Sequence, residues 1–162
     1  MAYIEYSDYT YIYGEGLSEA DFNRLDWDAE RLVDIQVTGI DDINKLSVAF
    51  PTVEKDAEAV KRCICKLIDT LSKIESIEAT MIPSSNGALQ SGGLVASRSS
   101  GSESISYATG FNATLTQAVT DEEVKTKLIN TIVRNYLSAV CDKNGVHLLY
   151  RGVYPYAIPD EE

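Results

Sequence analysis

The sequence has few of the residues from which active sites are usually built. It contains one histidine, His147, in 162 residues, and no serine stands in a G-x-S-x-G elbow. The stretch "SSNGALQSGG" lacks both the Gly-Lys-Ser/Thr of a P-loop and the G-x-G-x-x-G spacing of a dinucleotide fold. These absences disfavour a Ser-His-Asp mechanism and phosphate binding. We therefore predict no catalytic residue and no cofactor, with His147 at a surface or interface.

Cysteine is also scarce, with Cys63, Cys65 and Cys141 as the only three. An odd number of cysteines in a chain without a secretion signal favours reduced thiols. Residues two apart on a helix point about 200° away from each other, so Cys63 and Cys65 cannot both face one metal ion. We predict buried thiols and no metal site, while a small cytosolic thiol or metal protein using these cysteines and His147 remains an alternative.

Long hydrophobic runs are missing as well. No apolar run approaches the roughly 18 residues that a membrane-spanning helix needs, and no charged and then apolar leader stands at the N-terminus. We expect a soluble protein that is made in a cytosol and has no membrane partner.

Basic residues are also few compared with acidic ones. The 14 Lys and Arg residues face 25 Asp and Glu residues, which gives a formal net charge of -11. Residues 1–50 hold eleven of the acidic residues against three basic ones, so the acidity lies mainly in the first third. Such a field repels phosphate backbones and anionic lipids, which argues against a duplex-DNA reader. It suits a passage through which DNA must slide without sticking.

The acidic stretch "DWDAE" resembles a calcium loop only superficially, because it lacks the required glycine. In a helix, Asp26 and Glu30 share a face and Asp28 lies across it, so we predict a solvated acidic face. Acidic residues are numerous enough that a hydrolase with a pair of carboxylates stays open.

Apolar residues at helical spacing predict most of the fold. Ser7 could cap a short turn over 8–13 that ends at Gly14 and Gly16. Ser18 and Asp21 have capping-box spacing and start a helix over 19–37, and the longest helix is expected over 52–78 with Lys and Glu on its solvated face. A last long helix follows the capping box at Thr120 and runs to about Cys141.

Two segments do not read as helix. Between Pro83 and Gly110 the composition shifts to Ser and Gly, and the segments 94–97 and 104–108 could pair across a turn as a β-hairpin arm. After a turn at Asn144 and Gly145, "VHLLYRGVYPYAIPDEE" suggests an extended tail. We expect neither segment to add much to the core.

Tyrosine is the one residue type in clear excess, with ten Tyr against three Phe and one Trp. The tyrosines gather near the two ends of the chain, where a monomer core would gain little from them. Because tyrosine combines a large contact area with a polar group, we interpret these clusters as contact surfaces for other proteins.

Five stretches follow one another along nearly the whole length of the chain: "YTYIYGEGLSEADFNRL", "DIQVTG", "AVKRCICKLID", "VASRSSGSESISYA" and "NGVHLLYRGV". This ordered set resembles the head-tail connector proteins of long-tailed bacteriophages, also called adaptor or head-completion proteins. Glu15 departs from the pattern, since such proteins often have a second glycine there. The positions that match the family are Tyr9, Tyr13, Gly14, Glu19, Phe22, Ile35, Thr38, Ser97, Glu103, Ser106, Tyr107, Gly145, Leu149, Tyr150, Arg151 and Gly152.

The resemblance implies a structural protein of the virion neck that is assembled in the cytoplasm of the bacterial host. Such proteins form a homo-oligomeric ring, commonly a dodecamer, beneath the portal protein. The ring extends the channel through which DNA passes without specific binding, and it docks the stopper, also called the head-closure protein, or a tail protein. A stopper or tail terminator is the nearest alternative, but those proteins are expected to be rich in β-structure.

The predicted fold is thus mostly α, a helical bundle of about four helices in a single connector domain. The bundle takes residues 1–80 and 118–142, the β-hairpin arm takes 83–112 and precedes the last long helix, and the extended C-terminal tail takes 143–162. We predict contacts with the portal or a neighbouring subunit through Leu94, Val95, Ser97, Ser104, Ile105, Ser106, Tyr107, Leu149, Tyr150, Arg151, Tyr154 and Tyr156.

Overall fold

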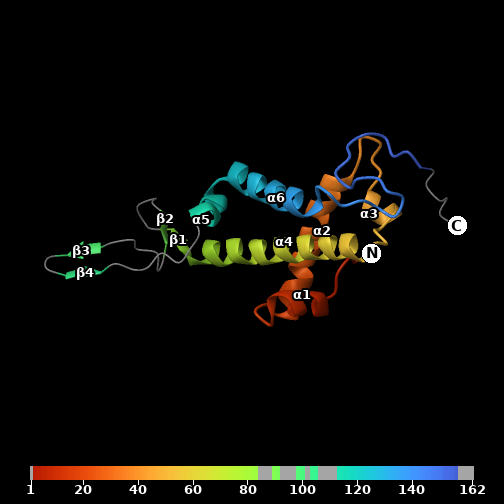
Figure 1. Ribbon diagram of the computed structural model, residues 1–162. Helices are drawn as coiled ribbons and strands as arrows, with labels where there is room; N and C mark the ends of the chain where they lie inside the picture. The colour runs from red at the N-terminus through yellow and green to blue at the C-terminus, as the bar shows by residue number, and fades with distance from the viewer. Residues whose placement is uncertain (1, 84–88, 92–97, 101–102, 106–112, 157–162) are drawn as a thin grey trace. The chain divides into compact units, whose positions relative to one another are not determined.

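The computed structural model describes residues 2–83, 89–91, 98–100, 103–105 and 113–156. Over these residues the protein is mostly helical, as predicted (Figure 1). The chain divides into two compact units, one made of residues 1–69 and 129–162 and the other of residues 70–128. The helices are α1 (Tyr6–Tyr13), α2 (Glu19–Val37), α3 (Lys45–Val48), α4 (Glu54–Thr80), α5 (Ala113–Thr120) and α6 (Glu122–Leu137).

Helix α2 has the bounds that its sequence predicts. The Ser18 hydroxyl accepts a hydrogen bond from the Asp21 amide at 3.1 Å and so pairs one of the free N–H groups of the first turn. Its buried face consists of Phe22, Leu25, Ala29, Val33 and Val37. This face repeats every three or four residues, which is the spacing that predicted the helix.

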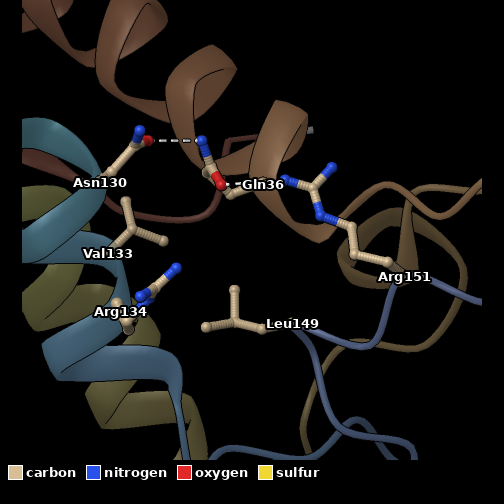
Figure 2. Close-up of a pocket in the computed structure, with 6 residues that line it drawn as sticks. All are labelled: Gln36, Asn130, Val133, Arg134, Leu149 and Arg151. Carbon is tan, nitrogen blue, oxygen red and sulfur yellow. Dashed lines mark hydrogen bonds between the residues drawn. The ribbon is translucent and has the colours of Figure 1, made fainter. Parts of the chain in front are cut away.

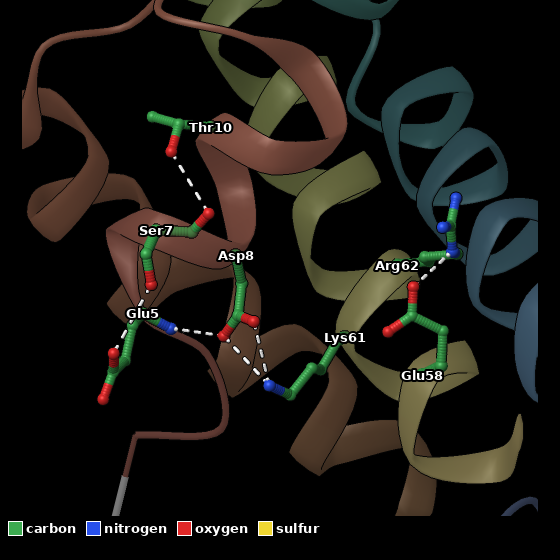
Figure 3. Close-up of polar contacts among 7 residues, drawn as sticks. All are labelled: Glu5, Ser7, Asp8, Thr10, Glu58, Lys61 and Arg62. Atoms are coloured by element: carbon green, nitrogen blue, oxygen red, sulfur yellow. Dashed lines mark hydrogen bonds and ion pairs between the residues drawn. The ribbon is translucent and has the colours of Figure 1, made fainter. Parts of the chain in front are cut away.

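Helix α1 starts earlier than predicted. Glu5, rather than Ser7, is the N-cap, and its amide donates to the Asp8 carboxylate at 3.0 Å. The same carboxylate accepts two hydrogen bonds from the Lys61 ammonium of α4, at 2.9 and 3.1 Å (Figure 3). This ion pair joins α1 to α4, and the helix ends as expected at Gly14, where φ is 78°.

Helix α4 is more deeply buried than the amphipathic pattern predicts. Its middle carries consecutive buried residues, Cys63, Ile64 and Cys65, followed by Leu67 and Ile68, none of which is exposed. Because neighbouring residues point to different sides of a helix, this stretch is covered on several sides. The predicted solvated face is limited to side chains such as Lys55 and Arg62. None of the helices in the described residues is long and apolar enough to cross a membrane.

The second unit contains short strands. β1 (Met81–Pro83) pairs antiparallel with β2 (Leu89–Ser91), and β3 (Arg98–Ser100) pairs antiparallel with β4 (Glu103–Ile105). The predicted strand 94–97 lies outside the described residues, so the arm as a whole stays a prediction. Helix α5 was not predicted, because "ATLTQAVT" is rich in threonine, a poor helix former.

Helix α6 ends at Leu137, not near Cys141 as predicted. The Leu148 amide donates to the Val140 carbonyl at 3.0 Å, and Cys141 forms an isolated antiparallel bridge with His147. These contacts need an extended backbone at 140–141, which a helix cannot supply. The chain therefore turns back at Asn144 and Gly145, as the Asn-Gly pair predicts.

The C-terminal tail corrects a second prediction. Its described part, up to Tyr156, folds against the first unit instead of extending away from it. Leu148 and Tyr154 of the tail are both buried in the core. The tail therefore adds to the core, contrary to our expectation.

Asp26 is the exception on the acidic face of α2, which we predicted to be solvated. Its Oδ1 atom is buried and has no hydrogen-bond partner, whereas Asp28 is exposed. Burial, reinforced by the nearby Glu30 carboxylate, raises the pKa of Asp26 to about 7. The folded protein therefore holds a proton here that the unfolded chain releases near pH 4.

This raised pKa predicts a pH-dependent effect of Asp26→Asn. The stabilising contribution of protonated Asp26 is complete below about pH 4 and is lost as the pH rises through about 7. Asparagine stays neutral, so the variant should gain stability relative to wild type, and the gain should grow between pH 4 and pH 8. Urea denaturation across this range measures it. The matched control is Asp28→Asn at the exposed position, and an equal, pH-independent effect of both substitutions would contradict the prediction.

Candidate functional site

The described tail is shaped by one buried carboxylate, Asp142. Its Oδ1 atom accepts hydrogen bonds from the amides of Asn144 and Val146, both at 2.8 Å. Its Oδ2 atom accepts the hydroxyl hydrogen of buried Tyr154 at 2.6 Å, and that hydroxyl also accepts from the Asn144 side-chain amide at 2.9 Å. Burial and the bond to Asp142 raise the pKa of Tyr154, so the phenol stays the donor.

The tail is also hydrogen-bonded to the connector between α2 and α3. The Ile40 amide donates to the Arg151 carbonyl at 3.1 Å, and the Tyr154 amide donates to the Asp41 carboxylate at 2.5 Å. Gly39 lies so close to the tail that a Cβ atom there would meet the Gly152 carbonyl oxygen at 2.9 Å. Only glycine permits this close approach without a shift of the backbone.

Lys45 fixes the other side of this connector. Its side chain is fully buried, and its ammonium donates to the Val37 carbonyl at the end of α2 at 2.7 Å. A cation at this place satisfies a carbonyl that the helix leaves unpaired and complements the helix dipole. Burial lowers the pKa of Lys45, an effect that the nearby carboxylates of Asp41 and Asp142 oppose.

Together the tail, α2 and α6 enclose a pocket of about 460 Å³, which we call the arginine pocket. Figure 2 shows side chains from these three segments around the same space. Gln36 links two of them, since its side-chain amide donates to Asn130 Oδ1 at 2.7 Å and its Oε1 accepts from Arg151 Nη2 at 3.1 Å. The lining residues are Gln36, Asn130, Val133, Arg134, Leu149 and Arg151.

The arginine pocket has no acidic residue in its lining, although the chain as a whole has a net charge of -11. Arg134 forms no ion pair within the described part of the chain, and Arg151 has only the neutral Gln36 as its side-chain partner there. Guanidinium groups in this state present several N–H donors to an incoming ligand. The pocket is therefore suited to a carboxylate or another planar anion.

A second pocket of about 420 Å³ lies along α2 and shares Arg151 with the first. Asp34 and Asp42 belong to its lining, so it is less favourable for an anion. Arg31 also lines it and lies 5.5 Å from the ring of exposed Trp27.

The predicted contact residues fall into three groups. Leu149 and Arg151 line the arginine pocket, and Tyr150 and Tyr156 are about half exposed, at 49% and 50%. Tyr154 is instead a buried hydrogen-bonded residue, which corrects its predicted place on a contact surface. Leu94, Val95, Ser97, Ser106 and Tyr107 lie outside the described residues, and of the predicted arm residues only Ser104 and Ile105 are placed, in β4.

Sequence reasoning missed Gln36, Asn130, Val133 and Arg134. Gln36 is 94 residues from Asn130 and 115 residues from Arg151, so no local pattern connects them. The available signal was the rarity of cations: an arginine in an acidic chain, such as Arg134, was a candidate for a contact role.

The thiols do not form a reactive or metal-binding centre in the described residues. Cys63 and Cys65 are buried as predicted, and burial raises the pKa of each thiol to about 12. Cys141 lies 3.5 Å from His147 Nδ1, but burial and nearby carboxylates raise its pKa as well. The described residues contain no cluster of three or more side chains able to hold a metal ion.

Comparisons of the chain with protein-family models, with curated proteins and with solved structures find no match. The site must therefore be interpreted from its own chemistry.

The hydrogen bonds of Asp142 predict that two substitutions reduce stability to different degrees. Asp142→Ala should lower the free energy of unfolding by about 3 kcal/mol, because it leaves the Tyr154 hydroxyl and two amides without their acceptor. Tyr154→Phe removes the hydroxyl that donates to Asp142 and accepts from Asn144, and should cost about 1–2 kcal/mol. Urea denaturation measures both, with exposed Tyr156→Phe as the matched control. If Asp142→Ala cost no more than the control, Asp142 would not hold the tail.

Proposed function

We propose that the protein is a structural, non-enzymatic component of a bacteriophage neck, a head-tail connector that forms a ring beneath the portal. The observation that carries the proposal is a set of large apolar side chains exposed on the first unit. Trp27 is 63% exposed, Ile40 78% and Val153 66%. Tryptophan, like arginine, is enriched in contacts between proteins, and exposed Ile40 and Val153 add apolar area that such a contact would cover. The resemblance in the order of the sequence motifs supplies the kind of assembly.

The charge supports the same proposal. A net charge of -11 repels the phosphates of DNA and so favours a channel that DNA crosses without binding. The ring would extend the portal channel in this way and offer a surface to the stopper or tail protein below it. A homo-oligomer of this kind is built from heterologous contacts that close on themselves.

The proposed arm belongs to the second unit. The pairing of β3 with β4 is compatible with a hairpin between α4 and α5. In this proposal the arm, residues 83–112, adds its free strand edges and aromatic residues to a neighbouring subunit or to the portal.

Two alternatives are less well supported. A stopper or tail terminator would be expected to be rich in β-structure, whereas the described residues are mostly helical. A thiol or metal protein would need an accessible thiolate, but Cys63 and Cys65 are buried, and the pKa of partly exposed Cys141 beside His147 is raised.

The test is co-expression with the portal protein encoded by the same genome, followed by electron microscopy of the purified complex. We expect rings of this protein attached to one end of the portal. Absence of both a ring and a portal contact would refute the proposed function. Neighbouring reading frames for a portal and a major capsid protein upstream, with tail genes downstream, would support it.

Deletion of residues 94–107 tests the role of the arm. The variant should unfold at nearly the same temperature as wild type, because the core of the first unit lies elsewhere in the chain. It should, however, fail to join the ring on the portal. The control replaces the same residues with a Gly-Ser linker of equal length, which keeps the chain length and removes the strands. A deletion variant that loses its cooperative thermal transition would show that the arm belongs to the core.

A further inference from the structure

The arginine pocket combines two kinds of lining that together specify a ligand. Arg134 and Arg151 supply positive charge, and half-buried Leu149 supplies an apolar wall. Figure 2 shows these side chains around one space, with Arg151 held by Gln36. A ligand that fits must carry carboxylates next to an apolar side chain.

Gln36 holds one of the two arginines of this pocket, Arg151, in place. It binds Arg151 Nη2 at 3.1 Å and Asn130 at 2.7 Å, and so connects the guanidinium to both α2 and α6. Because Gln36 is neutral, it orients Arg151 without cancelling its charge. The remaining guanidinium donors are then pre-oriented for an acidic partner, which lowers the entropy lost on binding.

The chain itself contains a segment with the required chemistry. Residues 157–162 read "AIPDEE", with three carboxylates, one isoleucine and no cation. Six extended residues span roughly 20 Å, enough to reach a neighbouring molecule from Tyr156.

We propose that the arginine pocket of one copy binds residues 157–162 of a second copy, with the carboxylates of Asp160, Glu161 and Glu162 against Arg134 and Arg151. Ile158 packs on Leu149. The choice of a second copy as the partner rests on the proposed function, in which copies join head to tail. A pocket and a segment at different places on one chain form such a heterologous contact, which closes into a ring when the rotation fits.

The charges around Arg151 also explain why the segment would bind in the arginine pocket and not in the second pocket. The second pocket along α2 shares Arg151 but contains Asp34 and Asp42, which repel an acidic segment. Attraction on one side of Arg151 and repulsion on the other direct the segment into the arginine pocket.

The experiment uses two full-length variants and sedimentation velocity. The pocket variant carries Arg134→Glu and Arg151→Glu, and the segment variant carries Asp160→Lys, Glu161→Lys and Glu162→Lys. Wild type should self-associate, more weakly as salt is added, and each variant alone should associate at least about 100-fold more weakly. A mixture of the two should associate again with the copies alternating, because the Arg pocket of one variant meets the acidic segment of the other and the Glu pocket meets the Lys segment. A chain with all five substitutions should associate again.

The matched control is Arg24→Glu with Arg62→Glu, which makes the same charge change on the first unit but outside the pocket. It should associate like wild type, and circular dichroism should show every variant folded. The proposal is overturned if wild type stays monomeric, if the two variants do not associate when mixed, or if the pocket variant associates like the control. Binding of the segment to its own chain would leave wild type monomeric, which is the first of these results.

The two proposals can fail separately. If rings form on the portal equally well with the pocket variant, the connector function stands and the pocket contact is refuted. If the variants follow the expected rule but no portal complex forms, the pocket contact stands and the connector function is refuted.

Discussion

The buried carboxylate of Asp142 is the interaction on which the rest of the described tail depends. A carboxylate is costly to remove from water unless hydrogen bonds replace its hydration, and here two amides and one phenol do so. These bonds bring Asn144, Val146 and Tyr154 around one point and so force the chain to turn back. That turn places Leu149 and Arg151 beside α2 and α6. The arginine pocket is thus a product of the tail's hydrogen bonds.

A second buried charge balances the first. Lys45 is fully buried, and the carboxylates of Asp41 and Asp142 act on it electrostatically. Isolated, either charge would cost several kcal/mol in an apolar interior, whereas opposite charges near hydrogen-bonding partners compensate one another. The connector between α2 and α3 is therefore held from both sides, by Lys45 at the Val37 carbonyl and by the tail at Ile40 and Asp41. These hydrogen bonds hold the end of α2 and the connector that follows it in one position.

Much of the helical part was predictable, because its determinants are local. Ser18 and the apolar spacing of α2 gave the bounds of that helix, and the helical geometry of Cys63 and Cys65 led to the correct expectation of buried thiols. The tail was predicted wrongly because its contacts join Tyr154 to Asp41 across 113 residues, and no sequence pattern reports such a pair. For the same reason only Leu149 and Arg151 of the pocket were anticipated. Asp26 was misjudged because facing residues from other segments, and not its own helix, decide its burial.

Gly39 shows how far a contact surface can depend on a residue that takes no part in contact. At Gly39 two backbone segments approach so closely that there is no room for a methyl group, since the Gly152 carbonyl oxygen would lie 2.9 Å from a Cβ atom. Gly152 directly follows Arg151, so a side chain at position 39 would press on the backbone next to this arginine. The position of Arg151 in the pocket therefore depends on the missing side chain at Gly39, where the two backbone segments approach each other. The arginine pocket would therefore be more sensitive to a substitution of Gly39, which has no side chain, than to substitutions of many residues that have one.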